Sequence, residues 1–151
     1  PDLLIADEPT TALDVTIQAQ ILRLIIDLVN RLQLTVLLIT HNLGVVAKTC
    51  EKAAVMYAGR VIEQAPVREL FKSPRHPYTR GLIQAVPTRQ TLRGSLEGIP
   101  GLIPNLNNPP LGCRFHPRCS EAMDICRQDI PVSAIVDSDH FTSCHLYSIT
   151  S

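Results

Sequence analysis

Two adjacent carboxylates and one imidazole have the types and spacing that could act on a phosphate. Asp7 and Glu8 directly follow the apolar run of residues 3–6. His41 directly follows a second apolar run, residues 35–40. One carboxylate can hold the magnesium that bridges phosphates, a second can orient an attacking water, and an imidazole can hydrogen-bond a terminal phosphate. The three side chains therefore predict a phosphoryl-transfer site, provided that the two runs lie side by side in a sheet.

The same residues also have an ordinary structural interpretation. Asp7, Glu8 and Pro9 form a common type of exit from a strand into a loop. His41 precedes Asn42, a residue type that often caps a helix. The spacing by itself leaves both interpretations open.

Four cysteines near the C-terminal end form a second group with possible chemistry. Five, six and seventeen residues separate them in turn, and they are Cys113, Cys119, Cys126 and Cys144. Four alternatives are open: two disulfides, a zinc site, a [4Fe-4S] cluster, or packed thiols without metal. Structural zinc sites usually pair their ligands as Cys-x2-4-Cys, a spacing that is absent here. Cys50 lies apart from this group and is predicted to be a buried core residue.

Alternating strands and helices are predicted to position Asp7, Glu8 and His41. Residues 3–6 and 35–40 have the continuous apolar composition of strands covered on both faces. Between them, apolar residues recur every three or four positions, which predicts a helix from about residue 15 to 33 with one face in the core. The stripe consists of Ile17, Ile21, Leu24, Ile25, Leu28 and Leu32. Asp14 is the expected N-cap of this helix, and the alternation predicts an α/β fold.

The rest of the chain is expected to hold short elements. The predicted helices cover residues 43–50, 67–72, 77–86 and 121–127, and a strand pair covers 54–57 and 60–64 around Gly59. Residues 87–112 are rich in proline and are expected to form an extended connection.

Composition limits the classes of function. The 151 residues include 14 Lys+Arg and 14 Asp+Glu, so the chain lacks the basic excess of a non-specific DNA-binding protein. Its apolar runs are far shorter than the roughly 20 residues that cross a bilayer. The chain begins with Pro1 and shows no signal peptide, so we expect a truncated N-terminus. Ten of the twelve prolines follow residue 64, which predicts two domains, 1–64 and 65–151.

Residues 3–14 resemble the Walker B strand and D-loop of ATP-binding cassette (ABC) ATPases, since they read Leu-Leu-Ile-Ala-Asp-Glu-Pro-Thr-Thr-Ala-Leu-Asp. Residues 39–42, Ile-Thr-His-Asn, resemble the switch histidine of the same family. The resemblance implies that Asp7 holds Mg²⁺ and that Glu8 is the general base. It also implies that His41 contacts the γ-phosphate of ATP and that Asp14 and its loop face a partner ATPase.

Other motifs of that family are absent from the sequence. It contains no Gly-x-x-x-x-Gly-Lys-Ser/Thr loop, no Gln switch and no Leu-Ser-Gly-Gly-Gln-type signature. In this family all three precede the Walker B strand. We therefore expect residues 1–64 to be the second half of a P-loop NTPase domain, and we expect the chain alone to be inactive as an ATPase.

A third motif narrows the family. Residues 73–82, Ser-Pro-Arg-His-Pro-Tyr-Thr-Arg-Gly-Leu, resemble the C-terminal extension of the ATPases of oligopeptide and dipeptide importers. The resemblance implies an irregular, cysteine-containing extension over residues 65–151, and the import of peptides or of nickel. The cysteine spacing resembles the [4Fe-4S] tail of some of these ATPases, with Zn²⁺ as the alternative metal.

The importer resemblance also implies partners and a location. The expected partners are two transmembrane permease subunits, a second ATPase subunit and an extracytoplasmic peptide-binding protein, with no nucleic acid. The expected location is the cytoplasmic face of the cell membrane.

Two other functions share part of the pattern. An ATPase of DNA repair or chromosome maintenance has the same Walker B layout, but it would be expected to show sustained heptads, which are absent here. A metal-binding interaction module would explain the cysteines. Neither accounts for the stretch His76, Pro77 and Tyr78.

Overall fold

The computed structural model describes residues 2–87 and 98–148 and contains both helices and strands. Its Cα positions separate into two compact units, residues 1–50 and 51–151. Part of the predicted extended connection over residues 87–112, namely residues 88–97, lies outside the described residues. No described helix is both long enough and apolar enough to cross a membrane.

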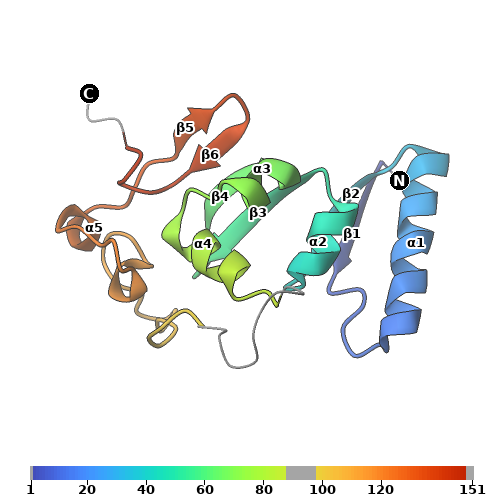
Figure 1. Cartoon of the computed structure of the whole chain (residues 1–151), viewed down its shortest axis with the longest axis horizontal. Coiled ribbons are helices and arrows are strands. Elements are labelled where there is room, and N and C mark those ends of the chain that lie inside the picture. The colour runs from blue at the N-terminus through green and yellow to red at the C-terminus, as the bar shows by residue number, and fades with distance from the viewer. Residues whose placement is uncertain (1, 88–97, 149–151) are drawn as a thin grey trace. The chain divides into compact units, whose positions relative to one another are not determined.

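The first unit contains two parallel strands and two helices (Figure 1). Its elements are β1 (Leu3–Asp7), α1 (Val15–Leu32), β2 (Thr35–Ile39) and α2 (Leu43–Thr49). The Asp14 carboxylate accepts hydrogen bonds from the backbone N–H groups of Thr16 and Ile17 at 3.0 and 2.9 Å, which caps α1 as the sequence predicts. Gln33 ends the helix in the left-handed conformation. The α/β expectation is therefore confirmed for this unit.

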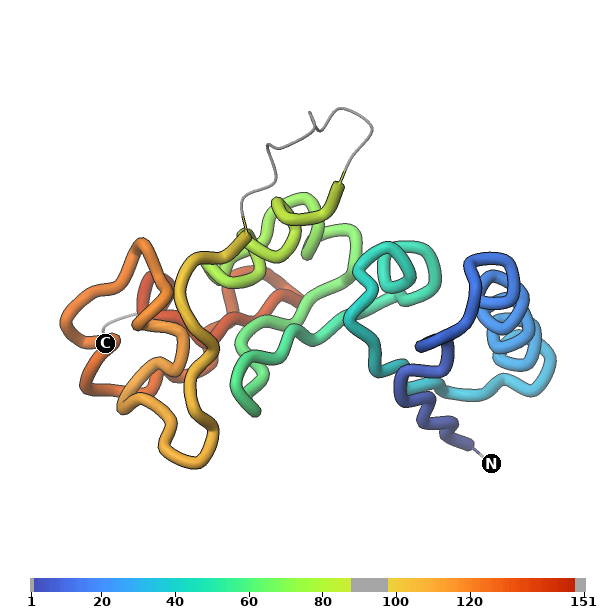
Figure 2. Tube along the Cα trace, turned by 90° about the horizontal axis from the view of Figure 1, so that it is seen from below, coloured from blue at the N-terminus to red at the C-terminus, as the bar shows by residue number. Residues whose placement is uncertain are grey.

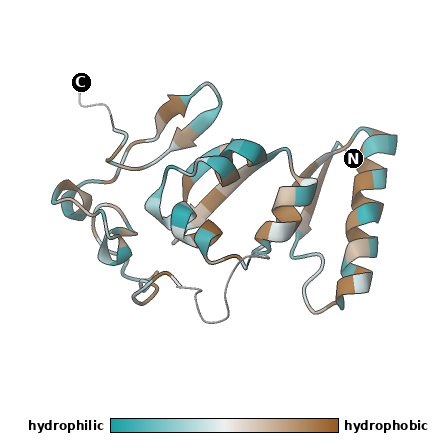
Figure 3. Cartoon of the chain, in the orientation of Figure 1, coloured by the Kyte–Doolittle hydropathy of each residue, from teal (hydrophilic) through white to brown (hydrophobic). Residues whose placement is uncertain are grey.

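Burial in the first unit differs from the prediction. No residue of α1 is fully buried, and its apolar stripe, coloured brown in Figure 3, remains partly exposed. Both strands were expected to be covered on both faces, yet the side chains of Ile5 and Leu37 are 60% and 51% exposed. A two-stranded sheet with two helices offers too little surface, within the described residues, to cover these side chains.

The second unit is built on an antiparallel sheet with the strand order β3-β4-β6-β5. The strands are β3 (Lys52–Tyr57), β4 (Arg60–Pro66), β5 (Ala134–Asp137) and β6 (His140–Thr142). Ala58 and Gly59 join β3 to β4 with positive φ angles of 48° and 78°, as in the turns that match strand twist. Figure 2 shows the C-terminal part of the chain returning beside β4, where Glu63 pairs with Thr142.

Short helices and an aromatic cluster complete the second unit. The helices are α3 (Val67–Lys72), α4 (Pro77–Gln84), the 3-10 helix η1 (His116–Arg118) and α5 (Ile125–Gln128). The buried core is formed by Val55, Tyr57, Ile62, Ala65, Leu70 and Phe115. The Phe115 ring lies edge-on to Tyr57, with ring centroids 5.2 Å apart. Residues as far apart in the sequence as Val55 and Phe115 thus share one core.

Several expectations need correction. The helix predicted over residues 121–127 is the four-residue α5, and the hairpin of β5 and β6 was not predicted. Cys50 is only half-buried, because it follows the last turn of α2. The compositional boundary near Ala65 falls inside one compact unit, since β4 pairs with both β3 and β6. The assignment of family domains to residues 1–64 and 65–151 stays a prediction.

Candidate functional site

The carboxyl ends of β1 and β2 lie side by side. The two strands are parallel and in register, with Asp7 opposite Ile39. The backbone N–H of Glu8 donates to the Ile39 carbonyl at 2.8 Å, so the pairing continues one residue beyond β1. Polar residues that follow the two strands must therefore meet at one edge of the sheet, where open α/β sheets bind ligands.

Glu8 and His41 are in direct contact at this edge. His41 Nδ1 lies 2.7 Å from Glu8 Oε1, and the His41 backbone N–H donates to the same oxygen at 3.2 Å. The other carboxylate oxygen, Oε2, accepts a hydrogen bond from the Thr11 hydroxyl at 2.6 Å. Residues that follow the two strand ends thus form one polar group that orients both oxygens of Glu8.

These contacts favour the charged form of Glu8. The Thr11 hydrogen bond, followed by the hydrogen bond with His41, lowers the pKa of the Glu8 carboxyl below its ordinary value of 4.5. Glu8 is therefore an ionised acceptor at neutral pH, and hydrogen bonds with Thr11 and His41 hold its carboxylate in position. Such a carboxylate can accept a proton or orient a water.

The backbone conformation of Glu8 and the exposure of Glu8 and His41 are also consistent with a ligand-binding site. Glu8 has a φ of 47°, a left-handed conformation that non-glycine residues seldom adopt outside special positions. The side chain of Glu8 is 35% exposed and that of His41 80% exposed, so both are accessible to a ligand.

The other two predicted site residues have different environments. Asp7 is the exposed last residue of β1 and no side-chain hydrogen bond of Asp7 occurs in the described part of the chain. Its carboxylate is available to a cation. The carboxylate of Asp14 is already engaged at the N-terminus of α1. The structure thus brings Glu8 and His41 together, sets Asp7 next to them along the chain, and gives Asp14 a local role.

Sequence reasoning gave no role to Thr11. Its position three residues after Glu8, in a turn where the Thr11 N–H donates to the Glu8 carbonyl at 3.1 Å, brings its hydroxyl back to the carboxylate. A Glu-x-x-Thr spacing after a strand was the available signal.

The four C-terminal cysteines lie in the second unit, where Cys126 and Cys144 are buried and Cys113 and Cys119 are half-buried. Burial raises the pKa of the thiols of Cys113, Cys119 and Cys144, the last to about 11. Backbone hydrogen bonds act in the opposite direction, while neighbouring cysteines raise the pKa further. The Cys113 backbone N–H donates to the Cys126 carbonyl at 2.9 Å. Among residues 2–87 and 98–148, however, no three His, Cys, Asp or Glu side chains have an arrangement that could hold a metal ion.

The His-Pro-Tyr stretch starts α4. His76 is the N-cap residue, and its Nδ1 accepts a hydrogen bond from the Tyr78 backbone N–H at 3.0 Å. The His76 ring lies 5.6 Å from the Phe115 ring, centroid to centroid, and the residue is 1% exposed. The stretch is therefore part of the core of the second unit and not an exposed binding motif.

A buried carboxylate that sequence reasoning missed supports the same stretch. Glu63 on β4 accepts hydrogen bonds from the backbone N–H groups of Arg75 and His76 at 2.6 and 2.9 Å. Its Oε1 also lies 2.7 Å from Nε2 of His140 on β6. A single acidic residue within a predicted strand gave no signal of this role.

The first unit thus defines an α/β protein class in which a carboxylate and a histidine meet at the carboxyl ends of parallel strands. Comparison with known proteins narrows this class. Residues 62–126 match the family model described as "Oligopeptide/dipeptide transporter, C-terminal region".

Relatives match across almost the whole chain. It is 56% identical over 145 residues to the probable peptide ABC transporter ATP-binding protein y4tR of Sinorhizobium fredii, a match that covers 95% of this chain and 43% of that protein. It is 49% identical over 147 residues to the oligopeptide transport ATP-binding protein AppD of Bacillus subtilis, a match that covers 97% of this chain and 45% of that protein. It is 51% identical over 134 residues to the oligopeptide transport ATP-binding protein OppD of Salmonella typhimurium, a match that covers 89% of this chain and 40% of that protein.

The chain is therefore a member of the family of oligopeptide and dipeptide ABC transporter ATP-binding proteins. It spans less than half of the length of each of the three relatives described.

Proposed function

We propose that this chain is part of the ATP-hydrolysing subunit of an ABC importer for peptides, with nickel as the alternative cargo of the same subfamily. The observation that carries the proposal is the contact of Glu8 with His41 at adjacent strand ends, 2.7 Å apart, in a chain related to peptide transport ATP-binding proteins. The other two functions considered from the sequence find no support in these relatives.

Each residue of the site has a role in this proposal. Asp7 provides the exposed carboxylate oxygens that Mg²⁺ prefers, and Mg²⁺ with ATP supplies the polarised phosphate. Glu8, held ionised by Thr11 and His41, orients a water and accepts its proton. His41 is exposed and can turn a ring nitrogen to the γ-phosphate. Asp14 caps the start of α1. The loop that ends at Asp14 faces a second ATPase subunit in this proposal.

The assembly in this proposal follows the importer family. Two permease subunits cross the membrane, and the ATPase subunits lie on its cytoplasmic face. A peptide-binding protein outside the membrane delivers the cargo. No nucleic acid takes part.

The experiment is a Glu8→Gln substitution in the complete ATP-binding subunit, assembled with its permease. Gln keeps the size of the side chain but cannot accept the proton, so we expect ATP hydrolysis to fall at least 100-fold while ATP binding is retained. Glu69→Gln, an equal charge change on the exposed face of α3, is the matched control and should hydrolyse ATP normally. Undiminished hydrolysis by Glu8→Gln would contradict the proposed role, and hydrolysis by the present chain alone would contradict its expected inactivity.

We further propose that Cys113, Cys119, Cys126 and Cys144 hold a [4Fe-4S] cluster, with Zn²⁺ as the alternative. Support comes from the proximity of the four cysteines within one unit, where Cys126 and Cys144 are buried and the Cys113 backbone N–H donates to the Cys126 carbonyl. Four thiolates are the usual ligand set of such a cluster.

Anaerobic purification followed by metal analysis and an absorption spectrum tests this proposal. We expect about four irons per chain and a broad band at roughly 400 nm, both lost in Cys119→Ser and retained in Cys50→Ser, which alters the other unit. Stoichiometric zinc without colour would establish the alternative, and a metal-free protein would leave four packed thiols.

A further inference from the structure

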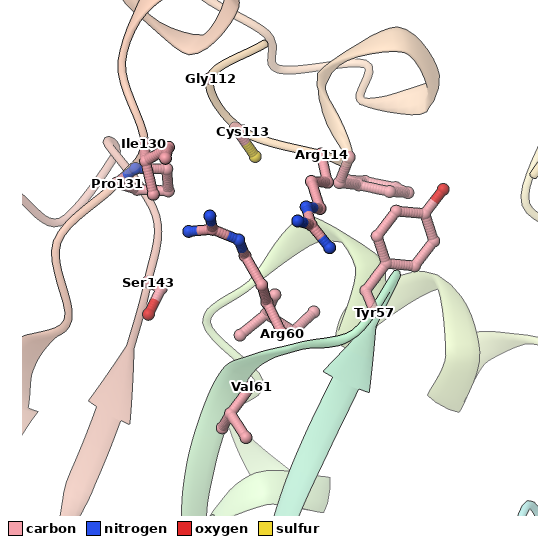
Figure 4. A pocket seen from close by; sticks show the side chains of 11 residues that line it. Tyr57, Arg60, Val61, Gly112, Cys113, Arg114, Ile130, Pro131 and Ser143 are labelled. Carbon is pink, nitrogen blue, oxygen red and sulfur yellow. The ribbon is translucent and has the colours of Figure 1, made fainter. Parts of the chain in front are cut away.

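A pocket of about 230 Å³ lies beside the turn between β3 and β4 in the second unit. Figure 4 shows it from close by. One wall is apolar and includes Val61, Ile130 and Pro131, while Gly112 and Cys113 supply another. Two arginines, Arg60 and Arg114, are among the lining residues, and no acidic residue is.

Both guanidinium groups lie at the pocket (Figure 4): that of Arg60 extends toward Ile130 and Pro131, and that of Arg114 points toward the β3–β4 turn. Arg114 is oriented because its Nη1 donates a hydrogen bond to the Ala58 carbonyl. Neither arginine forms an ion pair with any residue in the described ranges 2–87 and 98–148. Two other cations of this unit do have carboxylate partners, because Lys52 pairs with Asp139 and Arg80 with Glu121, each at 2.7 Å.

The pocket wall is held in place before any ligand arrives. Gly112 has a φ of 67°, and a Cβ atom at this position would come within 2.5 Å of the Cys126 carbonyl oxygen. The neighbouring Cys113 backbone N–H donates to the same carbonyl at 2.9 Å. The segment that carries Arg114 is thus fixed closely against the start of α5, which lowers the entropic cost of binding.

Two like charges that face one pocket without a carboxylate repel each other, and an anion between them removes this repulsion. The planar, fork-shaped guanidinium matches the oxygens of a carboxylate or a phosphate. The adjacent apolar wall favours a ligand that also has an aliphatic part.

We propose that this pocket binds a small molecule in which an oxyanion, either a carboxylate or a phosphate, adjoins an aliphatic group. The oxyanion lies between Arg60 and Arg114, and the aliphatic part contacts Ile130 and Pro131. This site belongs to the second unit and contains none of the strand-end residues of the first, so its test is separate from that of the proposed ATPase function. It shares Cys113 with the proposed metal site, and the arginine variants below leave all four cysteines unchanged.

Calorimetric titration of the full chain tests the proposal with three probes: inorganic phosphate, N-acetylleucine and N-acetylleucinamide. We expect one of the two anions, or both, to bind with a stoichiometry of one, and the uncharged amide not to bind. Preference for phosphate identifies a phosphorylated ligand, and preference for N-acetylleucine identifies a carboxylate.

Variants assign the binding to the pocket. Arg60→Gln and Arg114→Gln should each weaken binding at least tenfold, whereas Arg68→Gln, the same charge change on the exposed face of α3, should leave it unchanged. Arg60 is exposed, so its variant tests the proposal even if Arg114→Gln fails to fold. The proposal is overturned if neither anion binds, if the amide binds as well as N-acetylleucine, or if Arg60→Gln binds as tightly as the unchanged chain.

Discussion

At the scale of single residues, His76 shows how burial changes a side chain's chemistry. The ring is packed against Phe115, and its Nδ1 accepts a hydrogen bond from the Tyr78 backbone N–H. Burial lowers the pKa of His76 from its ordinary 6.5 to about 4; Arg80 lowers it further, while Glu63 acts in the opposite direction. The imidazole therefore stays neutral in the folded chain at pH values where the unfolded chain would be protonated.

This pKa shift predicts acid sensitivity of the second unit. Between pH 6.5 and about 4 the unfolded state binds a proton at His76 and the folded state does not, so stability falls as the pH falls through this window. The loss from this group amounts to at most about 3 kcal/mol. Urea unfolding of the full chain at several pH values measures it.

His76→Asn is the matched comparison, because Asn can still accept the capping hydrogen bond but does not titrate. The difference in unfolding free energy between the two proteins should shrink or change sign as the pH falls from 6.5 to 4. An equal pH dependence in both would show that His76 does not cause the effect.

At the scale of elements, α1 depends on its N-cap because it has little tertiary support. None of its residues is fully buried, and the Asp14 carboxylate satisfies two of the backbone N–H groups at its start. Asp14→Ala should therefore lower the unfolding free energy by about 1 kcal/mol, measured by circular dichroism during urea unfolding.

Asp27→Ala, an exposed position inside the same helix, is the control. It removes the same carboxylate without removing a cap, and alanine has the higher helix propensity. We expect no loss of stability from it, and an equal loss in both variants would contradict the capping role.

At the scale of the whole molecule, Glu63 connects segments that are distant in the sequence. Its carboxylate, which is fully buried, joins β4 to the start of α4 and to His140 on β6. Glu63→Gln presents an amide N–H₂ to these donors and leaves at least one of them unpaired inside the core.

We expect Glu63→Gln to lower the unfolding free energy by about 3 kcal/mol, as measured by urea unfolding followed by circular dichroism. Glu69→Gln, on the exposed face of α3, serves as the control and should change the unfolding free energy by less than about 0.5 kcal/mol. A Glu63 variant as stable as the Glu69 variant would show that these hydrogen bonds do not hold the segments together.

The sequence determined the local elements of this protein and the composition of its strand-end site. The periodicity from Ile17 to Leu32 and the cap at Asp14 define α1, and the two apolar runs define β1 and β2. These features depend on neighbouring residues, so sequence reasoning reaches them. Because parallel strands must place their carboxyl ends together, the meeting of Glu8 with His41 also followed from the sequence.

Only the tertiary structure decided which distant residues meet. Three features depend on how residues 112–143 return to the β3–β4 hairpin: the pairing of β6 with β4, the contacts of Glu63, and the presence of Arg60 and Arg114 at one pocket. No periodicity in the sequence encodes these long-range contacts, since they arise from loops whose path is set by packing. For the same reason, no sequence motif predicts the backbone hydrogen bond between Cys113 and Cys126, which are thirteen residues apart.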